Sequence, residues 1–214
     1  MLNFKNILMN LVTIFAFFIL MALGTWQIER LGQKNDLLKK IQRVSEDISD
    51  LKDVKIDNSN LDDWLYRKIK IHGDFISQEN IYIFTHLSDP RGKFGGAGYW
   101  VLNPFKSEEG NIIIINRGFI PQNIFDQFSS STNKYKENIV TGYVRKFEKE
   151  NIFTPEKNIE DRVLYLFEKN DIKKMFRIKK IEPYFIDQVD EYNALPQSNE
   201  TQLKFPNNHL SYAI

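Results

Sequence analysis

Cysteine is absent from this chain of 214 residues, and histidine occurs only as His72, His86 and His209. Without a thiol, the chain cannot form disulfides, cysteine-ligated zinc sites or iron–sulfur clusters, and it cannot use thiol catalysis. Three histidines are too few to favour a histidine-rich metal site within one chain. These absences exclude the functions that depend on sulfur chemistry.

An excess of charge of one sign is lacking as well. The chain has 29 Lys and Arg residues against 28 Asp and Glu residues, which gives a formal net charge of +1. No run of basic residues breaks this balance. A nucleic-acid backbone would meet no attractive patch, so we expect no nucleic-acid partner.

Recognisable catalytic motifs are also missing. The glycine-rich stretch GKFGGAG, residues 92–98, lacks the spacing of a phosphate-binding loop and leads into a strand rather than a helix. It is predicted to be a flexible hairpin loop. No Ser–His–Asp or His-x-x-x-His arrangement is evident, and a membrane-tethered hydrolase would need a convergent polar cluster. The residues alone therefore propose no catalytic site.

One long apolar run stands near the N-terminus. Residues 7–23 contain no charge, and extension to Trp26 gives a helix of about 30 Å at ~1.5 Å per residue, the thickness of a bilayer core. A cleaved signal peptide is the alternative, with Ala22 and Gly24 as small residues at a cleavage site, but its apolar region is usually only ~7–15 residues. The length favours an uncleaved transmembrane helix over residues 7–26, after an N-terminal tail of residues 1–6.

Residues 27–56 continue with helical spacing. Apolar residues recur at intervals of three, four and seven, which predicts an amphipathic connector helix that packs on the following domain. A coiled coil of two heptads is too short to assert. The recurring residues are Ile28, Leu31, Leu38, Ile41, Ile48 and Leu51.

Residues 57–208 show the two-residue alternation of strands. This pattern, with only one short helix expected near 168–178 and capped by Asn170 or Asp171, predicts an α+β protein whose main domain is mostly antiparallel β. A small barrel and a sandwich are both open. The predicted strands lie in residues 64–75, 80–87, 99–105, 111–121, 138–147, 162–168 and 181–189.

Three stretches are not explained by composition. In LGTWQIERL, Trp26 and Arg30 share a helix face at the end of the apolar run, where Trp26 would lie among lipid headgroups. In NIIIINRGFIP, Arg117 follows an apolar strand, where it could pair with a local carboxylate or a lipid phosphate, and Gly118 permits a tight bend. The third stretch is PNNHLSYAI, which contains Asn208 and His209.

With three shorter pieces, these stretches resemble the surfeit locus protein 1 family of cytochrome c oxidase assembly factors. The pieces occur in the family's order over nearly the whole chain. They are Gly24–Gln27 with Arg30, Gly98–Pro104, Asn116–Pro121, Thr141-Gly142 with Arg145, Glu182–Asp187, and Asn207–Leu210 with Tyr212-Ala213.

The resemblance implies a non-enzymatic protein of the bacterial inner membrane, or of the mitochondrial inner membrane in a eukaryote. Two spans would flank a large domain on the periplasmic side, and residues 209–214 would be the start of the second span. The basic residues Arg30, Lys34, Lys39 and Lys40 after the first span would alone favour a cytoplasmic domain, so the positive-inside rule conflicts with the family here. The expected partners are the lipid bilayer and either oxidase subunits or haem a synthase.

The resemblance also implies a transient site for haem a. We expect His209 to be a candidate ligand of the haem iron and Arg30 and Lys34 to pair with the propionates. Trp26 and Gln27 complete the expected cofactor site. Arg117, Gly118 and Asn208 belong to the motifs without an assigned role. The alternative is an anchored binding or scaffold module that contacts oxidase subunits without binding haem.

Overall fold

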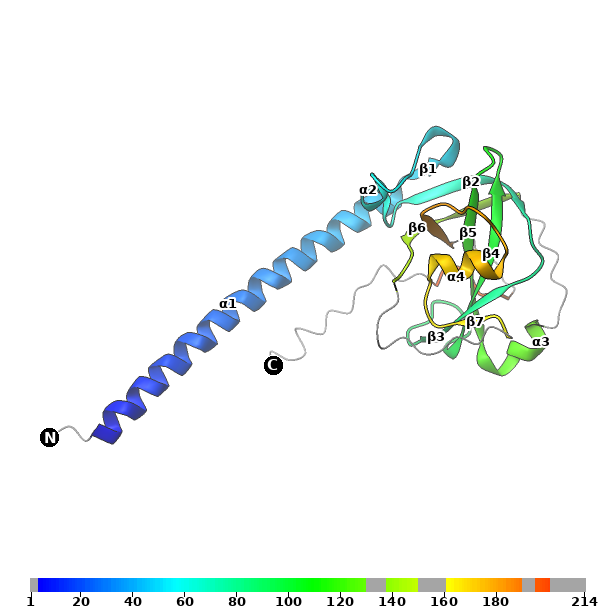
Figure 1. The fold of residues 1–214 in the computed structure, drawn as a ribbon. Coiled ribbons are helices and arrows are strands. Elements are labelled where there is room, and N and C mark those ends of the chain that lie inside the picture. Colours follow the sequence, from blue (N-terminus) through cyan, green and yellow to red (C-terminus); the bar gives the residue numbers. More distant parts are fainter. Residues whose placement is uncertain (1–3, 130–137, 150–160, 190–194, 201–214) are drawn as a thin grey trace. The chain divides into compact units, whose positions relative to one another are not determined.

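The computed structural model describes residues 4–129, 138–149, 161–189 and 195–200 of the chain, and side chains from residues 8–33 and from 47 onward within these ranges (Figure 1). The chain divides into an N-terminal unit that extends to Gln42 and a second unit over Arg43–Gln202. Each unit is described by itself.

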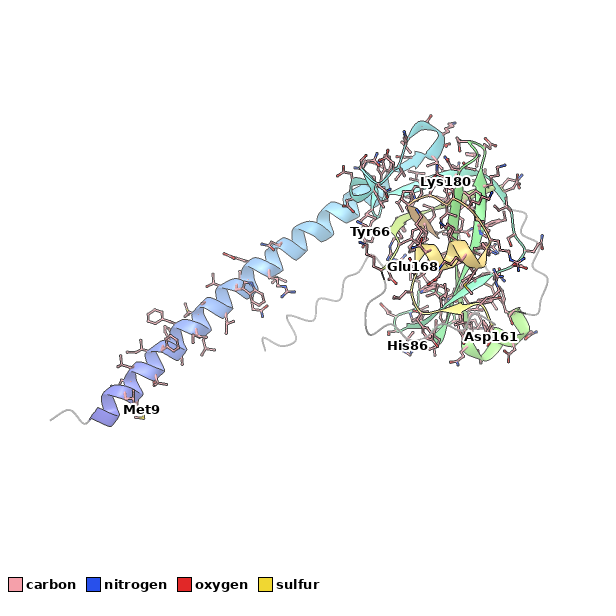
Figure 2. All side chains as sticks on the ribbon, in the orientation of Figure 1. Met9, Tyr66, His86, Asp161, Glu168 and Lys180 are labelled. Carbon is pink, nitrogen blue, oxygen red and sulfur yellow. The ribbon has the colours of Figure 1, made fainter. Side chains whose placement is uncertain are left out.

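The described part of the N-terminal unit lies in helix α1, Phe4–Glu46. Its segment Leu8–Gln33 has a mean hydropathy of 2.2, and none of it is buried. By length and composition this segment could cross a membrane, but a signal sequence near an N-terminus can have the same length and composition. Figure 2 shows its side chains projecting on all sides of the helix. Thr13 and Thr25 donate their hydroxyls to the carbonyls of Met9 and Met21, each at 2.9 Å, so these polar groups are satisfied within the helix.

The predicted connector helix ends earlier than residue 56. α1 stops at Glu46, strand β1 occupies Ile48–Asp50, and Leu51–Asp53 form a 3₁₀ turn in which the Asp50 carboxylate accepts a hydrogen bond from the backbone N–H of Lys52 at 3.2 Å. β1 pairs in parallel with β2, and Leu51 is buried in the domain core. The predicted end of the helix was wrong because Ile48 lies in a paired strand and Leu51 packs in the core, although their spacing resembles that of one helix face.

The second unit is a mixed sheet with the strand order β1-β2-β6-β8-β5-β4-β3-β7. Among the described strands, three pairs, β1–β2, β3–β7 and β5–β8, are parallel and the other five are antiparallel, so the domain is mostly antiparallel as predicted. The remaining strands are β2 Lys68–Phe75, β3 Ile81–Leu87, β4 Gly96–Ser107, β5 Ile112–Pro121, β6 Ile139–Lys146, β7 Val163–Leu164 and β8 Tyr184–Gln188.

Five of these strands form a closed circuit of pairing. β2 pairs with β6 through Lys68–His72 and with β4 through Gly73–Phe75, so the order β2–β6–β8–β5–β4 returns to β2. One sheet that closes in this way differs from a sandwich of two separate sheets. The α+β class and the β-rich main domain predicted from the sequence are confirmed.

The described domain holds three short helices where the sequence predicted one. α2 is Leu61–Trp64, α3 is Phe125–Ser129 and α4 is Lys169–Met175. α4 is the helix that was predicted, but its N-cap is Glu168, whose carboxylate accepts a hydrogen bond from the backbone N–H of Asp171 at 2.7 Å. The longer Glu side chain reaches the third residue of the helix and takes the role that was assigned to Asn170 or Asp171.

The predicted hairpin of β4 and β5 is the centre of the fold. Lys106 pairs with Ile112 at the closed end, and a β-bulge interrupts the register between Trp100 and Leu102. The run of four isoleucines in β5 reflects burial on both strand faces. Ile113 and Ile115 pack in a cluster to which all five circuit strands contribute, whereas Ile112 and Ile114 pack with α4 and β3.

Truncation of the central isoleucine tests this core. Ile115 is fully buried, so Ile115→Ala is expected to lower the free energy of unfolding of the domain by about 2–5 kcal/mol, and Ile115→Val by about 0.5–1.5 kcal/mol. Ile139→Ala, at an exposed position on β6, is the control and should change it by less than about 0.5 kcal/mol. Urea unfolding followed by circular dichroism measures the three values, and equal losses for Ile115→Ala and Ile139→Ala would contradict this core.

Candidate functional site

Three residues of the quoted motifs meet on neighbouring strands. Asp187 of β8 accepts a hydrogen bond from the Asn116 side-chain amide of β5 on Oδ1, at 2.9 Å, and one from Arg145 Nη1 of β6 on Oδ2, at 2.6 Å. Asp187 and Asn116 are each only 5% exposed, and the Arg145 side chain is 32% exposed. We call Asn116, Arg145 and Asp187 the Asp187 cluster.

The Asp187 cluster is a structural lock, in the sense that its hydrogen bonds hold neighbouring strands together. Each carboxylate oxygen has a donor, and the Arg145 guanidinium also lies 5.3 Å from the centre of the Tyr66 ring. A buried carboxylate is tolerated only when it is paired and hydrogen-bonded, and here the partners come from both adjacent strands. The cluster therefore fixes β5, β8 and β6 to one another.

Asn116 also binds the backbone of its own motif. Its side-chain oxygen accepts a hydrogen bond from the backbone N–H of Gly118 at 3.3 Å. Gly118 has φ +137° and lies so close to the backbone of Gln197 and Ser198 that a Cβ would overlap with it. Phe119 and Gln197 exchange two backbone hydrogen bonds of 2.8 Å beside it. Glycine is thus required at 118 by a close backbone approach in addition to the bend.

Arg117 is buried, with 7% of its surface exposed. Its guanidinium lies 5.0 Å from the centre of the Phe75 ring, and Phe75 in turn packs edge-on against Phe105 of the core with ring centres 5.0 Å apart. A cation over an aromatic face is favourable, more so when it is shielded from water. Arg117 therefore contacts the end of the cluster formed by the circuit strands.

A second polar cluster was not foreseen from the sequence. The Gln197 amide accepts from the backbone N–H of Phe94 and donates to its carbonyl, both at 2.8 Å. The buried Glu200 carboxylate accepts from the N–H groups of Arg91 and Gly92 at 2.8 and 2.7 Å, and from Gln197 Nε2 at 2.7 Å. We call Gln197 and Glu200 the clasp.

The clasp corrects the expectation of a flexible glycine-rich loop. It holds the backbone of residues 91–94 at four atoms, and Gly96–Gly98 already belong to β4. No local spacing in residues 195–200 indicates that Gln197 and Glu200 are buried. Only their long-range partners reveal the role.

The predicted cofactor residues on α1 are placed in part. The Arg30 guanidinium lies 5.2 Å from the centre of the Trp26 ring, which confirms that they share a helix face. Trp26, Gln27 and Arg30 are all exposed. The Lys34 side chain, Asn208 and His209 lie outside the described part of the chain, so their assigned roles stay predictions.

The two other histidines have local surroundings. His72 Nε2 lies 3.4 Å from Asp50 Oδ2, and His86 is exposed on β3. Burial would raise the pKa of Asp50, but the N–H and charge of Lys52 and the adjacent His72 outweigh it and lower that pKa. Among the described residues, no group of three or more histidine and acidic side chains could hold a metal ion.

Comparison with known proteins decides the family. A sequence model of the SURF1 family matches residues 14–214. This chain belongs to the SURF1 family. It is 31% identical over 209 residues to Surfeit locus protein 1 of Gallus gallus, and the match covers 90% of this chain and 65% of that protein. The family resemblance drawn from the motifs is thereby confirmed.

Other SURF1 family relatives match with similar identity. A SURF1-like protein of Rickettsia felis is 28% identical, with 96% of this chain and 88% of the relative covered. Surfeit locus protein 1 of Homo sapiens is 26% identical, with 99% and 72% covered. The chain thus spans slightly less than two thirds of the chicken protein and most of the bacterial one.

The Asp187 cluster can be tested against the exposed ion pair between Lys146, which follows Arg145 on β6, and Asp62 of α2. Asp187→Ala should cost about 3–5 kcal/mol of unfolding free energy because the mutation leaves the Arg145 charge and the Asn116 amide without their shared acceptor. Lys146 and Asp62 form an exposed pair at 2.9 Å, and Asp62→Ala should cost less than about 1 kcal/mol. Chemical denaturation of both variants measures the difference, and similar losses would contradict the structural lock.

Gly118→Ala tests the close approach of residues 197–198. The new Cβ overlaps with the Gln197 carbonyl, and a positive φ is unfavourable for alanine, so the variant should unfold at a lower denaturant concentration than the wild type. Gly110→Ala is the matched control, because Gly110 also has a positive φ but open space around its Cβ position. Gly118→Ala should be the more destabilising of the two; the reverse order would exclude the steric explanation.

Proposed function

We propose that this SURF1 family protein is a membrane-anchored assembly factor for cytochrome c oxidase that handles haem a before its insertion into the oxidase. The single observation that carries the proposal is the family match over residues 14–214. The β domain, on the periplasmic side of a bacterial inner membrane, would contact oxidase subunits or haem a synthase.

The character of α1 supports the anchor. Segment Leu8–Gln33 exposes apolar side chains along its length, and such a surface is stable in lipid rather than in water. Trp26 lies near the polar end of this segment with an exposed ring, which suits the headgroup region. The bilayer is therefore the proposed partner of this helix.

The exposed residues near the end of the anchor fit one part of haem a. The Arg30 guanidinium, held over Trp26, offers donors in a planar fork that matches a propionate. Gln27 is exposed on the neighbouring position, and Lys34 follows Arg30 by one helical turn. These residues would bind and orient the propionates at the membrane surface, with the isoprenoid tail in lipid.

His209 is the residue that would ligate the haem iron, through a neutral imidazole nitrogen. Of the other histidines, His72 is next to Asp50 and His86 lies in the β domain on β3. Haem a itself, when bound, would supply the redox-active iron for the oxidase. The chain's residues would only hold it and release it.

A haem difference spectrum of the detergent-purified full chain tests the proposal. His209→Ala should weaken haem a binding at least tenfold, and Arg30→Ala by about two- to fivefold, since an exposed charge pair contributes ~0.2–1 kcal/mol. His86→Ala is the matched control and should bind haem as the wild type does. Circular dichroism of each variant establishes that the fold is kept.

A parallel assay separates haem handling from a scaffold role. Each variant is introduced into cells that lack the protein, and the assembled oxidase is measured by its haem a absorbance. Oxidase assembly that depends on the protein, with no haem bound by the purified chain, would support the scaffold alternative. Oxidase assembly that is the same with and without the protein would overturn the assembly role itself.

A further inference from the structure

Five aromatic rings of the β domain contact one another in an unbroken series. The Tyr165 and Phe84 ring centres are 6.0 Å apart, Phe84 and Tyr99 5.7 Å, Tyr99 and Phe125 4.3 Å, and Phe125 and Tyr82 4.8 Å. We call these five residues the aromatic ladder. Such edge-on and tilted pairs are mutually favourable and form a firm apolar surface.

One end of the aromatic ladder is covered and the other is open. Tyr82 packs with Val101, Ile120 and Phe128, so α3 lies over this end. At the other end, Phe84 is 37% exposed and Tyr165 36% exposed. Large aromatic side chains that stay exposed beside a packed cluster are typical of contact surfaces, where they act as anchors.

Two exposed carboxylates border the aromatic ladder. Burial raises the pKa of the Tyr99 hydroxyl, and the nearby Tyr165, Asp126 and Asp161 raise it further, so both acids act on the Tyr99 end of the Phe84–Tyr99 ring pair. Asp126 lies on α3, and Asp161 lies just before β7 (Figure 2). A cation that settles on the ladder would therefore meet ring faces and negative charge together.

The adjacent strand edge is only partly used. β7 pairs with β3 at Tyr82 and Ile83 and ends at Leu164. Within the described part of the chain, Thr85, His86 and Leu87 are paired on the β4 side alone. An open edge beside exposed aromatic side chains can accept an added strand, whose side chains would alternate toward and away from Phe84.

We propose that the aromatic ladder and the β3 edge at Thr85–Leu87, which no described strand pairs on that side, form a docking site for an extended segment of a partner protein that carries arginine or lysine. The partner's backbone would pair along Thr85–Leu87, and its cationic side chains would lie on Phe84 and Tyr165 near Asp161. The carboxylates disfavour an anionic lipid surface at the same place. This site is independent of haem binding, so either proposal can fail without the other.

A labelled hexapeptide of alternating valine and arginine is the probe for this site. It is titrated with the full chain in detergent at low ionic strength, and fluorescence anisotropy measures its binding. Saturable binding is expected, with a matched valine–glutamate peptide failing to bind. Phe84→Ala, Tyr165→Ala and the double variant Asp126→Asn with Asp161→Asn should each raise the Kd about fivefold or more, the effect of losing ~1 kcal/mol of cation–π or charge attraction. Asp74→Asn, an exposed acid on β2, is the control and should leave the Kd unchanged.

Phe84→Leu separates loss of the ring from a folding defect, because leucine keeps an apolar side chain at this position and removes the ring face. This variant should also weaken binding of the arginine peptide. The proposal is overturned if the wild type does not bind the arginine peptide, or if binding is the same in the ladder variants as in Asp74→Asn. It is also overturned if Phe84→Ala instead abolishes self-association in analytical ultracentrifugation, since the ladder would then be an interface between copies of this chain.

Discussion

A carboxylate buried among three strands needs a donor on each oxygen, and Asp187 obtains them from Asn116 and Arg145. The rest of the domain depends on this arrangement. β8 is parallel to β5 and antiparallel to β6, and it joins the hairpin of β4 and β5 to the pair of β2 and β6. Because the closed circuit runs through β8, a register slip at Asp187 would separate the charge from its partners and open the circuit at once.

The two faces of the β4–β5 hairpin pack against different parts of the domain. On one side, Ile113 and Ile115 fill the cluster shared by the circuit strands, with Arg117 over Phe75 at its end. On the other face, Ile112 and Ile114 pack with residues of α4 and β3. In the motif Gly98-Tyr99-Trp100, Tyr99 belongs to the aromatic ladder, whereas Trp100 packs against the Phe119 ring and the cluster that contains Ile114.

Local patterns in the sequence were sufficient to predict the long helix, the β-rich domain, the central hairpin and α4. Periodicity and apolar length reflect short-range physics, which a single sequence displays directly. The predicted end of α1 was wrong because Leu51 is buried by residues distant in the chain. The additional short helices and the parallel strand pairs depend on tertiary packing. Among the site residues, the shared face of Trp26 and Arg30 followed from helical spacing.

The polar clusters could not be derived in the same way. Asn116, Arg145 and Asp187 stand far apart in the chain, and only their presence in the family motifs marked them. Gln197 and Glu200 carried no mark, because buried polar residues are defined by the partners that satisfy them. Those partners lie about a hundred positions earlier, at residues 91–94, with separations of 103 to 109 residues.

That separation has a consequence for the order of events during synthesis. The backbone groups of Arg91, Gly92 and Phe94 cannot be satisfied by the clasp until residues 197–200 have left the ribosome. Contacts so distant in the chain close late and slowly, because the loop-closure entropy precedes any gain. The first half of the domain therefore stays incompletely hydrogen-bonded until that point, long after helix α1 has left the ribosome.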